Sequence, residues 1–425
     1  MRLFLFAVLI FSVSFVQAGD WPQWKGSARD NRSTETGLNT DWNRNPPPLI
    51  QSISGLGIGF SNLCFSGDRI FTMGDFDGRT CLIALDRKSC RMIWKKDIGE
   101  GGKVNGYVGP KATPAAGNQR VFGLNQKGIL FCCDSESGKI LWEKNLYEDF
   151  DGYLMKRGPK RDDDWGYAES PLLDGNRVVC CPGGEKGAVI ALNAENGDLV
   201  WRARELKNRA CYDSIVPMQS SLGRWYLTIT EGDFAGIDPK SGKILWKVPF
   251  TGSPSLCCDA VCDGDYTCFS FAVKKGFFGY KIEKKEGQLV PRALYTLNET
   301  GNKHHGMIQD RGYVYAATDR GEFLCFDLKS GKLAWKNRRL RGSCVQTFFE
   351  GHLILRQERT GDLLLVEANP EKYVEKGKIR QPDRSDKNAW VYPVIADGRL
   401  FVRDQDRLFL YDLKIPAENK QEHGI

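Results

Sequence analysis

Apolar and polar residues alternate along the chain in a way that predicts pairs of short strands. Runs such as Ala188-Val-Ile-Ala-Leu192 and Phe323-Leu-Cys-Phe326 are each followed by a polar turn. A second apolar run ending in Trp comes after the turn, as in Asp238-Pro-Lys-Ser-Gly242-Lys-Ile-Leu-Trp246. Short apolar runs on either side of a Gly-containing turn indicate a β-hairpin.

This Asp-to-Trp phrase is an internal repeat. In five places a Trp follows an Asp or Asn by eight residues, and in four of them Gly occupies the turn, where it adopts a positive φ at no steric cost. Cys90 takes that place in the first copy, so an altered or strained turn is expected there. The five pairs are Asp86 and Trp94, Asp134 and Trp142, Asn193 and Trp201, Asp238 and Trp246, and Asp327 and Trp335.

A second hairpin precedes each phrase. Eight turn signals are followed by apolar or aromatic runs, and degenerate phrases near Glu283, Glu367 and Asp412 raise the number of phrases to eight. Both counts predict eight units of two hairpins, that is, four strands per unit. The turn signals begin at Gly67, Gly117, Gly175, Gly223, Gly264, Gly312, Gly351 and Gly398.

The two ends of the repeat region predict a closed ring. The last unit lacks its final strand, whereas a spare strand, Leu49-Ile-Gln-Ser-Ile53, precedes the first complete unit. An N-terminal strand that completes the last blade removes the exposed sheet edges. The expected fold is therefore an all-β, eight-bladed β-propeller of four-stranded antiparallel blades. It forms a single domain over 19–425, with an N-terminal extension at 19–48 and the closing strand at 49–54.

The first 18 residues have the pattern of a secretory signal peptide. Arg2 precedes an apolar run from Leu3 to Val16, and Ala18 offers a small residue at the cleavage site. No Cys follows this site, so a lipid anchor is not expected, and no later run is apolar enough to span a bilayer. We expect cleavage after Ala18 and a periplasmic or secreted monomer.

Charge and metal-binding residue types exclude several functions. The net charge of +7 is spread along the chain, and its densest basic run, 156–161, is followed at once by three Asp, so no nucleic-acid partner is expected. The 14 Cys include no C-x-x-C pair and there are only four His, which leaves little for a metal site. No Ser-His-Asp arrangement or phosphate loop can be recognised by spacing.

The repeated phrase resembles the quinoprotein-type repeat of pyrroloquinoline-quinone (PQQ) dehydrogenases and of the propeller lipoprotein in the outer-membrane β-barrel assembly machine. The opening Asp20-Trp-Pro-Gln-Trp-Lys-Gly26 and the segments 165–171 and 304–306 are similar to secreted PQQ-like propellers of planctomycete-type bacteria. The resemblance implies that the motif Trp packs between neighbouring blades. The matching residues are Trp94, Trp142, Trp201, Trp246 and Trp335.

In a propeller, the loops that enter the inner strands surround the mouth of the central channel, and this mouth is the expected place for a ligand. The alternative is that these side chains plug the channel and pack on one another. Loop positions include Phe60-Ser-Asn62 and Gln346. The candidate ligand-binding residues are Tyr107, Trp165, Tyr167, Glu169, Ser170, Tyr212, Ser214, Cys257, Cys258, Asp259, His304, His305, Trp390 and Tyr392.

Two function classes remain. The leading hypothesis is a non-catalytic binding or scaffold module, without a required cofactor, for a protein, peptide or cell-envelope component at the channel mouth. The alternative implied by the resemblance is a PQQ-dependent dehydrogenase that oxidises an alcohol or sugar. It would place Cys257-Cys258, Glu169 and Asp259 near the quinone and require Ca²⁺. Other adjacent Cys, at 132–133 and 180–181, are in strands and are expected to be structural.

Overall fold

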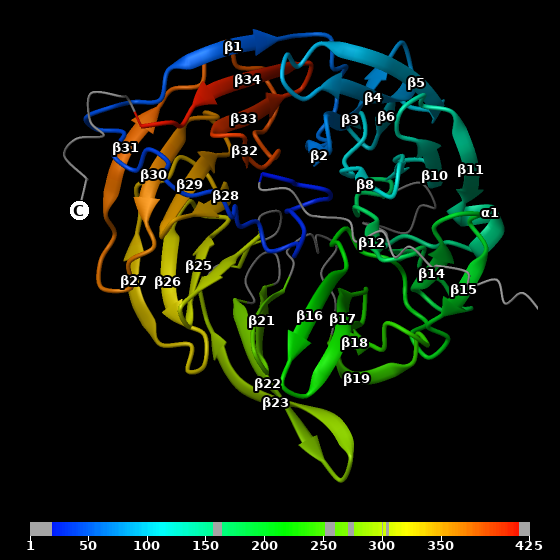
Figure 1. Ribbon diagram of the computed structural model, residues 1–425. Coiled ribbons are helices and arrows are strands. Elements are labelled where there is room, and N and C mark those ends of the chain that lie inside the picture. The colour runs from blue at the N-terminus through cyan, green and yellow to red at the C-terminus, as the bar shows by residue number, and fades with distance from the viewer. Residues whose placement is uncertain are drawn as a thin grey trace, which may run out of the picture.

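The computed structural model describes residues 19–155, 164–250, 260–270, 276–299, 301–302 and 306–415. Eight four-stranded antiparallel sheets stand around a ring, as Figure 1 shows. The eight-bladed propeller predicted from the repeat is confirmed. Within the described residues, no helix is long and apolar enough to cross a membrane.

Blades 1 to 4 follow one another directly along the chain. Each begins with a short inner strand and ends with the outer strand that carries the repeated Trp. The strands are β2 (Cys64–Ser66), β3 (Arg69–Phe76), β4 (Arg79–Asp86) and β5 (Met92–Glu100) in blade 1; β8 (Ala115–Gly117), β9 (Arg120–Leu124), β10 (Ile129–Asp134) and β11 (Ile140–Asn145) in blade 2; β12 (Leu172–Asp174), β13 (Arg177–Cys180), β14 (Ile190–Asn193) and β15 (Leu199–Arg202) in blade 3; and β16 (Val216–Ser220), β17 (Gly223–Ile229), β18 (Asp233–Ile237) and β19 (Ile244–Pro249) in blade 4.

Blades 5 to 8 repeat this plan. A small hairpin of β6 (Lys103–Val104) and β7 (Tyr107–Val108) joins blades 1 and 2, and the short helix α1 (Leu146–Phe150) follows blade 2. The remaining strands are β20 (Val261–Asp263), β21 (Tyr266–Ser270), β22 (Phe277–Lys285) and β23 (Gln288–Leu297) in blade 5; β24 (Ile308–Asp310), β25 (Tyr313–Ala317), β26 (Phe323–Asp327) and β27 (Leu333–Asn337) in blade 6; β28 (Cys344–Phe349), β29 (His352–Gln357), β30 (Leu363–Glu367) and β31 (Glu375–Ile379) in blade 7; and β32 (Val394–Ala396), β33 (Arg399–Asp404), β34 (Arg407–Asp412) and β1 (Leu49–Ile53) in blade 8.

The ring closes through the N-terminal strand, as predicted. β1 pairs antiparallel with β34 as the outer strand of blade 8, with Ser52 opposite Phe409. Arg403 of blade 8, fully buried, reinforces the closure: its guanidinium donates to the carbonyls of Ser61 at 2.9 Å and Met73 at 2.7 Å in blade 1. Because buried guanidinium groups are costly unless their donors are satisfied, this residue fixes blade 8 against blade 1.

The repeated Trp residues pack between blades, as the resemblance implied. Trp201 lies opposite Ala191 in its own blade and against the turn glycine of the next blade, where a Cβ on Gly242 would be 2.5 Å from the indole. Its Nε1 donates to the carbonyl of Pro239 in that next turn at 3.0 Å. Trp142 makes the corresponding bond to Ala194 at 3.1 Å. A small residue opposite the Trp and a Gly in the next blade's turn thus leave space for the indole ring. We call this packing of the Trp position against the next blade the interblade seam.

Three blades fill the same seam with other residues. In blade 5, Tyr295 lies opposite Gly279 and against Gly331 of blade 6, so the repeat position there is two residues earlier than the Glu283 predicted from sequence. The hairpin of β22 and β23 is longer than the others and projects from the ring in Figure 1. Trp42 of the N-terminal extension lies against Gly377 of blade 7. Gln51 of blade 8 donates to the Ser89 carbonyl at 3.2 Å.

Cys90 keeps the common turn rather than altering it. Its φ is +56°, in the region that favours Gly, and its N–H donates to the Asp86 carbonyl at 2.8 Å, as that of Gly242 does to Asp238. The predicted strain is therefore present at this turn. The thiol of Cys90 is buried.

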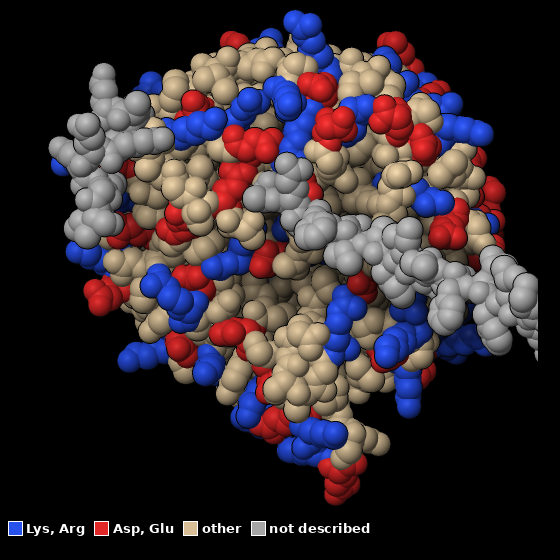
Figure 2. Space-filling model, in the orientation of Figure 1, with Lys and Arg blue, Asp and Glu red and all other residues tan. Residues whose placement is uncertain are grey.

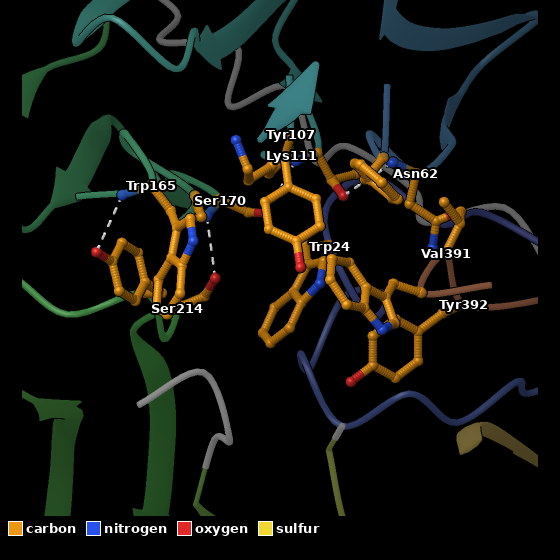
Figure 3. A pocket seen from close by; sticks show the side chains of 14 residues that line it. Trp24, Asn62, Tyr107, Lys111, Trp165, Ser170, Ser214, Val391 and Tyr392 are labelled. Atoms are coloured by element: carbon orange, nitrogen blue, oxygen red, sulfur yellow. Dashed lines mark hydrogen bonds between the residues drawn. The ribbon is translucent and has the colours of Figure 1, made fainter. Parts of the chain in front are cut away.

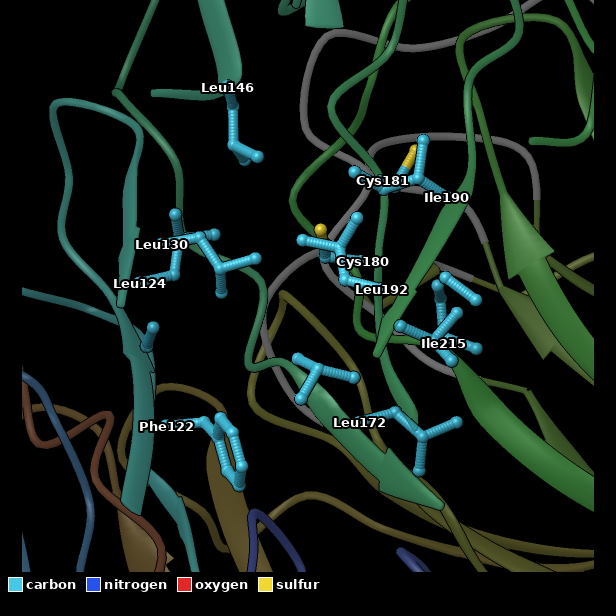
Figure 4. Close-up of a cluster of buried hydrophobic side chains, with 14 of the residues drawn as sticks. Phe122, Leu124, Leu130, Leu146, Leu172, Cys180, Cys181, Ile190, Leu192 and Ile215 are labelled. Carbon is cyan, nitrogen blue, oxygen red and sulfur yellow. The ribbon is translucent and has the colours of Figure 1, made fainter. Parts of the chain in front are cut away.

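The cysteines serve as core residues. Twelve of them are described, and eleven of these are buried. Figure 4 shows Cys180 and Cys181 among Leu172, Ile190 and Leu192 of the largest core cluster. Burial raises the pKa of both of these thiols well above the usual value, which keeps them protonated and unreactive. The structural role expected for the pairs at 132–133 and 180–181 is consistent with this burial.

The N-terminal extension runs through the ring. The sequence predicted an extension but not its path, which Figure 1 shows in dark blue inside the propeller. We call residues 19–35 the central segment. It pairs with inner strands of several blades through Trp21 and Phe65 in blade 1, through Arg32 and Gln309 in blade 6, and through Ser33 and Phe348 in blade 7.

Candidate functional site

A chain of hydrogen bonds links the loops that enter the inner strands of blades 1 to 4. The backbone N–H of Asn62 donates to Thr113 Oγ1 at 3.3 Å, that of Thr113 to Ser170 Oγ at 2.9 Å, and that of Ser170 to Ser214 Oγ at 2.9 Å. Each loop therefore holds the next one in place. The result is a rigid polar arc along one side of the channel mouth.

Aromatic side chains stand in front of this arc. Tyr107, on the β6–β7 hairpin, lies 5.2 Å from Trp390 and 6.2 Å from Phe60, measured between ring centroids. Phe60 and Trp390 are also 5.2 Å apart. These tilted and edge-to-face contacts are typical of favourable aromatic pairs. The hairpin between blades 1 and 2 thus reaches across to the loop that enters blade 8.

Two further aromatic pairs complete the enclosure. Trp165 and Tyr212 meet edge to face with centroids 5.3 Å apart, and Trp24 of the central segment meets Tyr392 at 6.3 Å. The ammonium of Lys25 lies 4.5 Å from the Trp24 ring. Together with the polar arc, these rings surround a cavity of about 150 Å³, which we call the aromatic cup (Figure 3).

Half of the predicted ligand-binding residues line this cup. They come from the loops entering blades 2, 3, 4 and 8, as expected for a channel mouth. The aromatic members of this set also pack on one another around the cavity, as the alternative expectation describes. The residues concerned are Tyr107, Trp165, Ser170, Tyr212, Ser214, Trp390 and Tyr392.

Two of the predicted residues face away from the cup. Tyr167 is 1% exposed and donates to the Pro182 carbonyl at 2.8 Å, and Glu169 is 2% exposed. Successive side chains of an extended segment point to opposite sides, so Ala168 and Ser170 line the cup while their neighbours point into the core. Cys257, Cys258, Asp259, His304 and His305 lie outside the described residues.

Several cup residues were not among the candidates. Phe60 and Asn62 are in a loop that the repeat located at the mouth, so their position could be predicted although their role was not. Lys111 and Thr113 follow the β6–β7 hairpin, whose length the repeat does not indicate. Trp24 reaches the cup only because the central segment enters the ring, and no local pattern predicts that path.

Glu169 has an unusual electrostatic environment. One carboxylate oxygen accepts the N–H of Cys181 at 2.5 Å, whereas Oε2 is buried and has no hydrogen-bond partner in the part of the chain that the structure describes. Burial raises the pKa of this carboxyl to about 8, although the Cys181 N–H and the charge of Arg29 oppose the shift. Desolvation favours the neutral acid in this way because a buried charge is costly. Glu169 is therefore a largely protonated core residue at neutral pH.

The described residues do not fit a quinone and its calcium ion. Glu169, the described carboxylate of the expected set, faces the core and is mainly neutral, whereas Ca²⁺ prefers ionised carboxylate and carbonyl oxygens. The part of the chain that the structure describes contains no group of three or more His, Cys, Asp or Glu that could hold a metal. The adjacent cysteines within that part are free and buried.

Comparison with known proteins identifies the family. The family model described as outer membrane protein assembly factor BamB matches residues 77–337, which is more than half of the chain. The chain belongs to this family. A BamB from Moranella endobia (strain PCIT) is 24% identical over 285 residues, a match that covers 65% of this chain and 69% of the relative. A BamB from Yersinia pestis is 24% identical over 258 residues, and here the match covers 57% of this chain and 60% of the relative.

Solved structures show the same architecture. BamB from Moraxella catarrhalis has a TM-score of 0.58 and 12% identity, with 87% of this chain and 98% of that chain covered. Quinohemoprotein alcohol dehydrogenase from Comamonas testosteroni has a TM-score of 0.64 and 14% identity, with 94% and 81% covered. At such identities the likeness establishes the propeller fold alone, since one fold hosts many functions.

Proposed function

We propose that this BamB-family chain is a non-catalytic propeller scaffold that binds a partner protein of the cell envelope through the aromatic cup. The observation that carries the proposal is the cup itself. Rigid aromatic side chains surround a cavity at the mouth of a ring whose interior is otherwise crossed by the central segment. Trp and Tyr dominate the binding energy of many protein interfaces, because they bury large areas at low cost in conformational entropy.

Family membership supports a protein partner outside the cytoplasm. The curated relatives carry the name of an outer membrane protein assembly factor, which places their work at the envelope. The leader-like pattern at 1–18, which lies outside the described residues, agrees with export. On the face shown in Figure 2, basic and acidic side chains intermingle over the ring, which gives no support to a nucleic-acid partner.

The proposal is tested by affinity capture from the native cell envelope. Wild-type protein, a Tyr107→Ala variant and a Tyr147→Ala variant serve as baits, and the captured proteins are quantified by mass spectrometry. Tyr147 is a matched control because it is 39% exposed, contacts Tyr167 rather than the cup residues, and follows blade 2 on α1. We expect one or a few proteins to be captured by the wild type and by Tyr147→Ala, and to be depleted about tenfold with Tyr107→Ala.

Two outcomes would contradict this function. Equal capture by all three baits would show that the partner protein does not bind at the aromatic cup. Capture of no specific protein by any bait would oppose the scaffold role altogether. A folding defect is checked by thermal melts of the three proteins. Each is expected to unfold in a single cooperative transition, because Tyr107 lies on a hairpin outside the blades.

A further inference from the structure

The polar groups of the aromatic cup are mainly donors. The side-chain Oδ1 of Asn62 accepts the N–H of Leu63 at 2.8 Å, so the orientation of the amide is fixed and Nδ2 is left as the donor. Asn62 is 3% exposed, lines the cup, and its Nδ2 has no hydrogen-bond partner among the described residues. A buried amide donor without a partner is costly, and a ligand acceptor would relieve that cost.

The hydroxyl groups of the polar arc are also available as hydrogen-bond donors. Thr113 Oγ1 and Ser170 Oγ each already accept a backbone N–H, and both residues are buried in the wall of the cup. Each hydroxyl proton can therefore be donated to a ligand. Lys111 adds a cation to the lining, and the described lining includes no carboxylate.

The rings supply flat apolar faces on two sides of these donors. The Phe60, Tyr107 and Trp390 group stands on one side, and the pair of Trp165 and Tyr212 stands on the other, as Figure 3 shows for the labelled members. A matching ligand has apolar rings that pack on aromatic faces and acceptors without N–H groups. Proline has both properties, because its ring replaces the backbone N–H and its carbonyl remains a strong acceptor.

We infer that the aromatic cup recognises a proline-rich, polyproline II segment of the partner protein. This inference rests on the proposed function and names the chemistry of its ligand. Aromatic grooves with a few fixed donors bind such segments well, since a polyproline II helix is already ordered before binding. The cation of Lys111 and the ammonium of Lys25 beneath Trp24 disfavour a basic segment, so neutral or acidic flanks are expected.

Two other ligand classes fit the cup less well. A carbohydrate presents as many donors as acceptors, and its hydroxyl protons would find no carboxylate in the described lining. A quaternary ammonium group prefers an aromatic cage with nearby negative charge, whereas Lys25 and Arg29 already lie within 5.1 Å of the Trp24 ring. Both classes serve as rival outcomes of the test.

The test titrates the full mature chain with synthetic ligands. Three capped ten-residue proline-rich peptides with neutral, acidic and basic flanks are compared with a capped Gly-Ser peptide, maltohexaose and choline. Binding is followed by tryptophan fluorescence, because Trp24, Trp165 and Trp390 line the cup, and is confirmed by calorimetry. We expect the neutral and acidic proline-rich peptides to bind, the basic one to bind more weakly, and the other three ligands to leave the signal unchanged.

Variants locate the interaction. Asn62→Asp retains the acceptor for Leu63 but removes the donor, and is expected to weaken peptide binding about tenfold. Tyr107→Ala, on a hairpin outside the core, is expected to weaken peptide binding by a similar factor, and Tyr147→Ala to leave it unchanged.

Unchanged binding in both cup variants, or no binding of any proline-rich peptide, would overturn the inference. So would binding of maltohexaose or choline that Tyr107→Ala abolishes. Capture of a protein through Tyr107 without peptide binding would overturn the inference while leaving the proposed scaffold function intact.

Discussion

Replacing Glu169 with Gln is expected to remove a large pH dependence of stability. The carboxyl has a pKa of about 8 in the folded protein because it is buried, against an ordinary value of 4.5. Between these two pH values the folded state retains a proton that the unfolded state has released. The free energy of unfolding therefore falls as the pH rises from about 4.5 to about 8. In Glu169→Gln this contribution is absent.

The size of the effect follows from the two pKa values. Each unit of difference corresponds to about 1.4 kcal/mol, so the shift gives about 5 kcal/mol over the whole range. Most of it falls between pH 5 and pH 8. The amide of the variant can still accept the Cys181 N–H. Its NH₂ group occupies the place of the buried Oε2, which costs stability equally at both pH values and cancels in the comparison.

Urea unfolding at pH 5 and pH 8, followed by circular dichroism, measures this contribution. The wild type is expected to lose several kcal/mol more than Glu169→Gln between the two pH values. Glu195→Gln, in the exposed turn of blade 3, is expected to behave like the wild type. Equal pH dependence in the wild type and Glu169→Gln would refute the assignment of Glu169 as a protonated core residue. It would restore this carboxylate as a candidate ligand or base.

The remaining predictions concern the interblade seam and the quinone alternative. Gly242→Ala places a Cβ 2.5 Å from the Trp201 ring at a φ of +73° and is expected to cost about 3 kcal/mol. Gly312→Ala, with a φ of +82° but no atom within 4 Å, is expected to cost about 1 kcal/mol, and equal losses in urea unfolding would contradict the seam. Trp201→Phe loses the bond to Pro239, whereas Nε1 of Trp246 has no hydrogen-bond partner among the described residues. In urea unfolding, Trp201→Phe is therefore expected to be more destabilising than Trp246→Phe by about 1 kcal/mol. With added PQQ and Ca²⁺, dye reduction with a panel of alcohols is expected to stay at the rate without protein, and turnover would contradict a non-catalytic role.

The propeller could be predicted from the sequence because its seams are encoded locally. A small residue, a turn Gly and a Trp recur at fixed spacing, and each meets the corresponding residues of the next blade, as Trp201 meets Gly242. The sequence does not predict the exact register of blade 5, because Tyr295 replaces the Trp there and the hairpin is longer. An internal repeat predicts only the features that the blades have in common, so a blade that differs from the others is predicted less well.

The cup could be predicted only in part. The loops at the mouth follow from the strand order, which is why Trp165, Tyr212 and Trp390 were recognised. Strand alternation within a loop was not resolved from sequence, so Glu169 was assigned to the mouth although it faces the core. The position of Trp24 in the cup depends on hydrogen bonds between the central segment and strands far away in the sequence, which no local pattern indicates.

Site-specific photo-crosslinking in the native cell envelope tests most directly whether the aromatic cup binds an envelope partner. A photoreactive phenylalanine analogue replaces Tyr107 in the cup or Tyr147 outside it, and adducts are identified after irradiation. A defined protein adduct, mapped to a proline-rich segment, is expected from position 107, and none is expected from position 147. The same adducts from both positions, or no protein adduct from position 107, would contradict the claim that the aromatic cup binds an envelope partner.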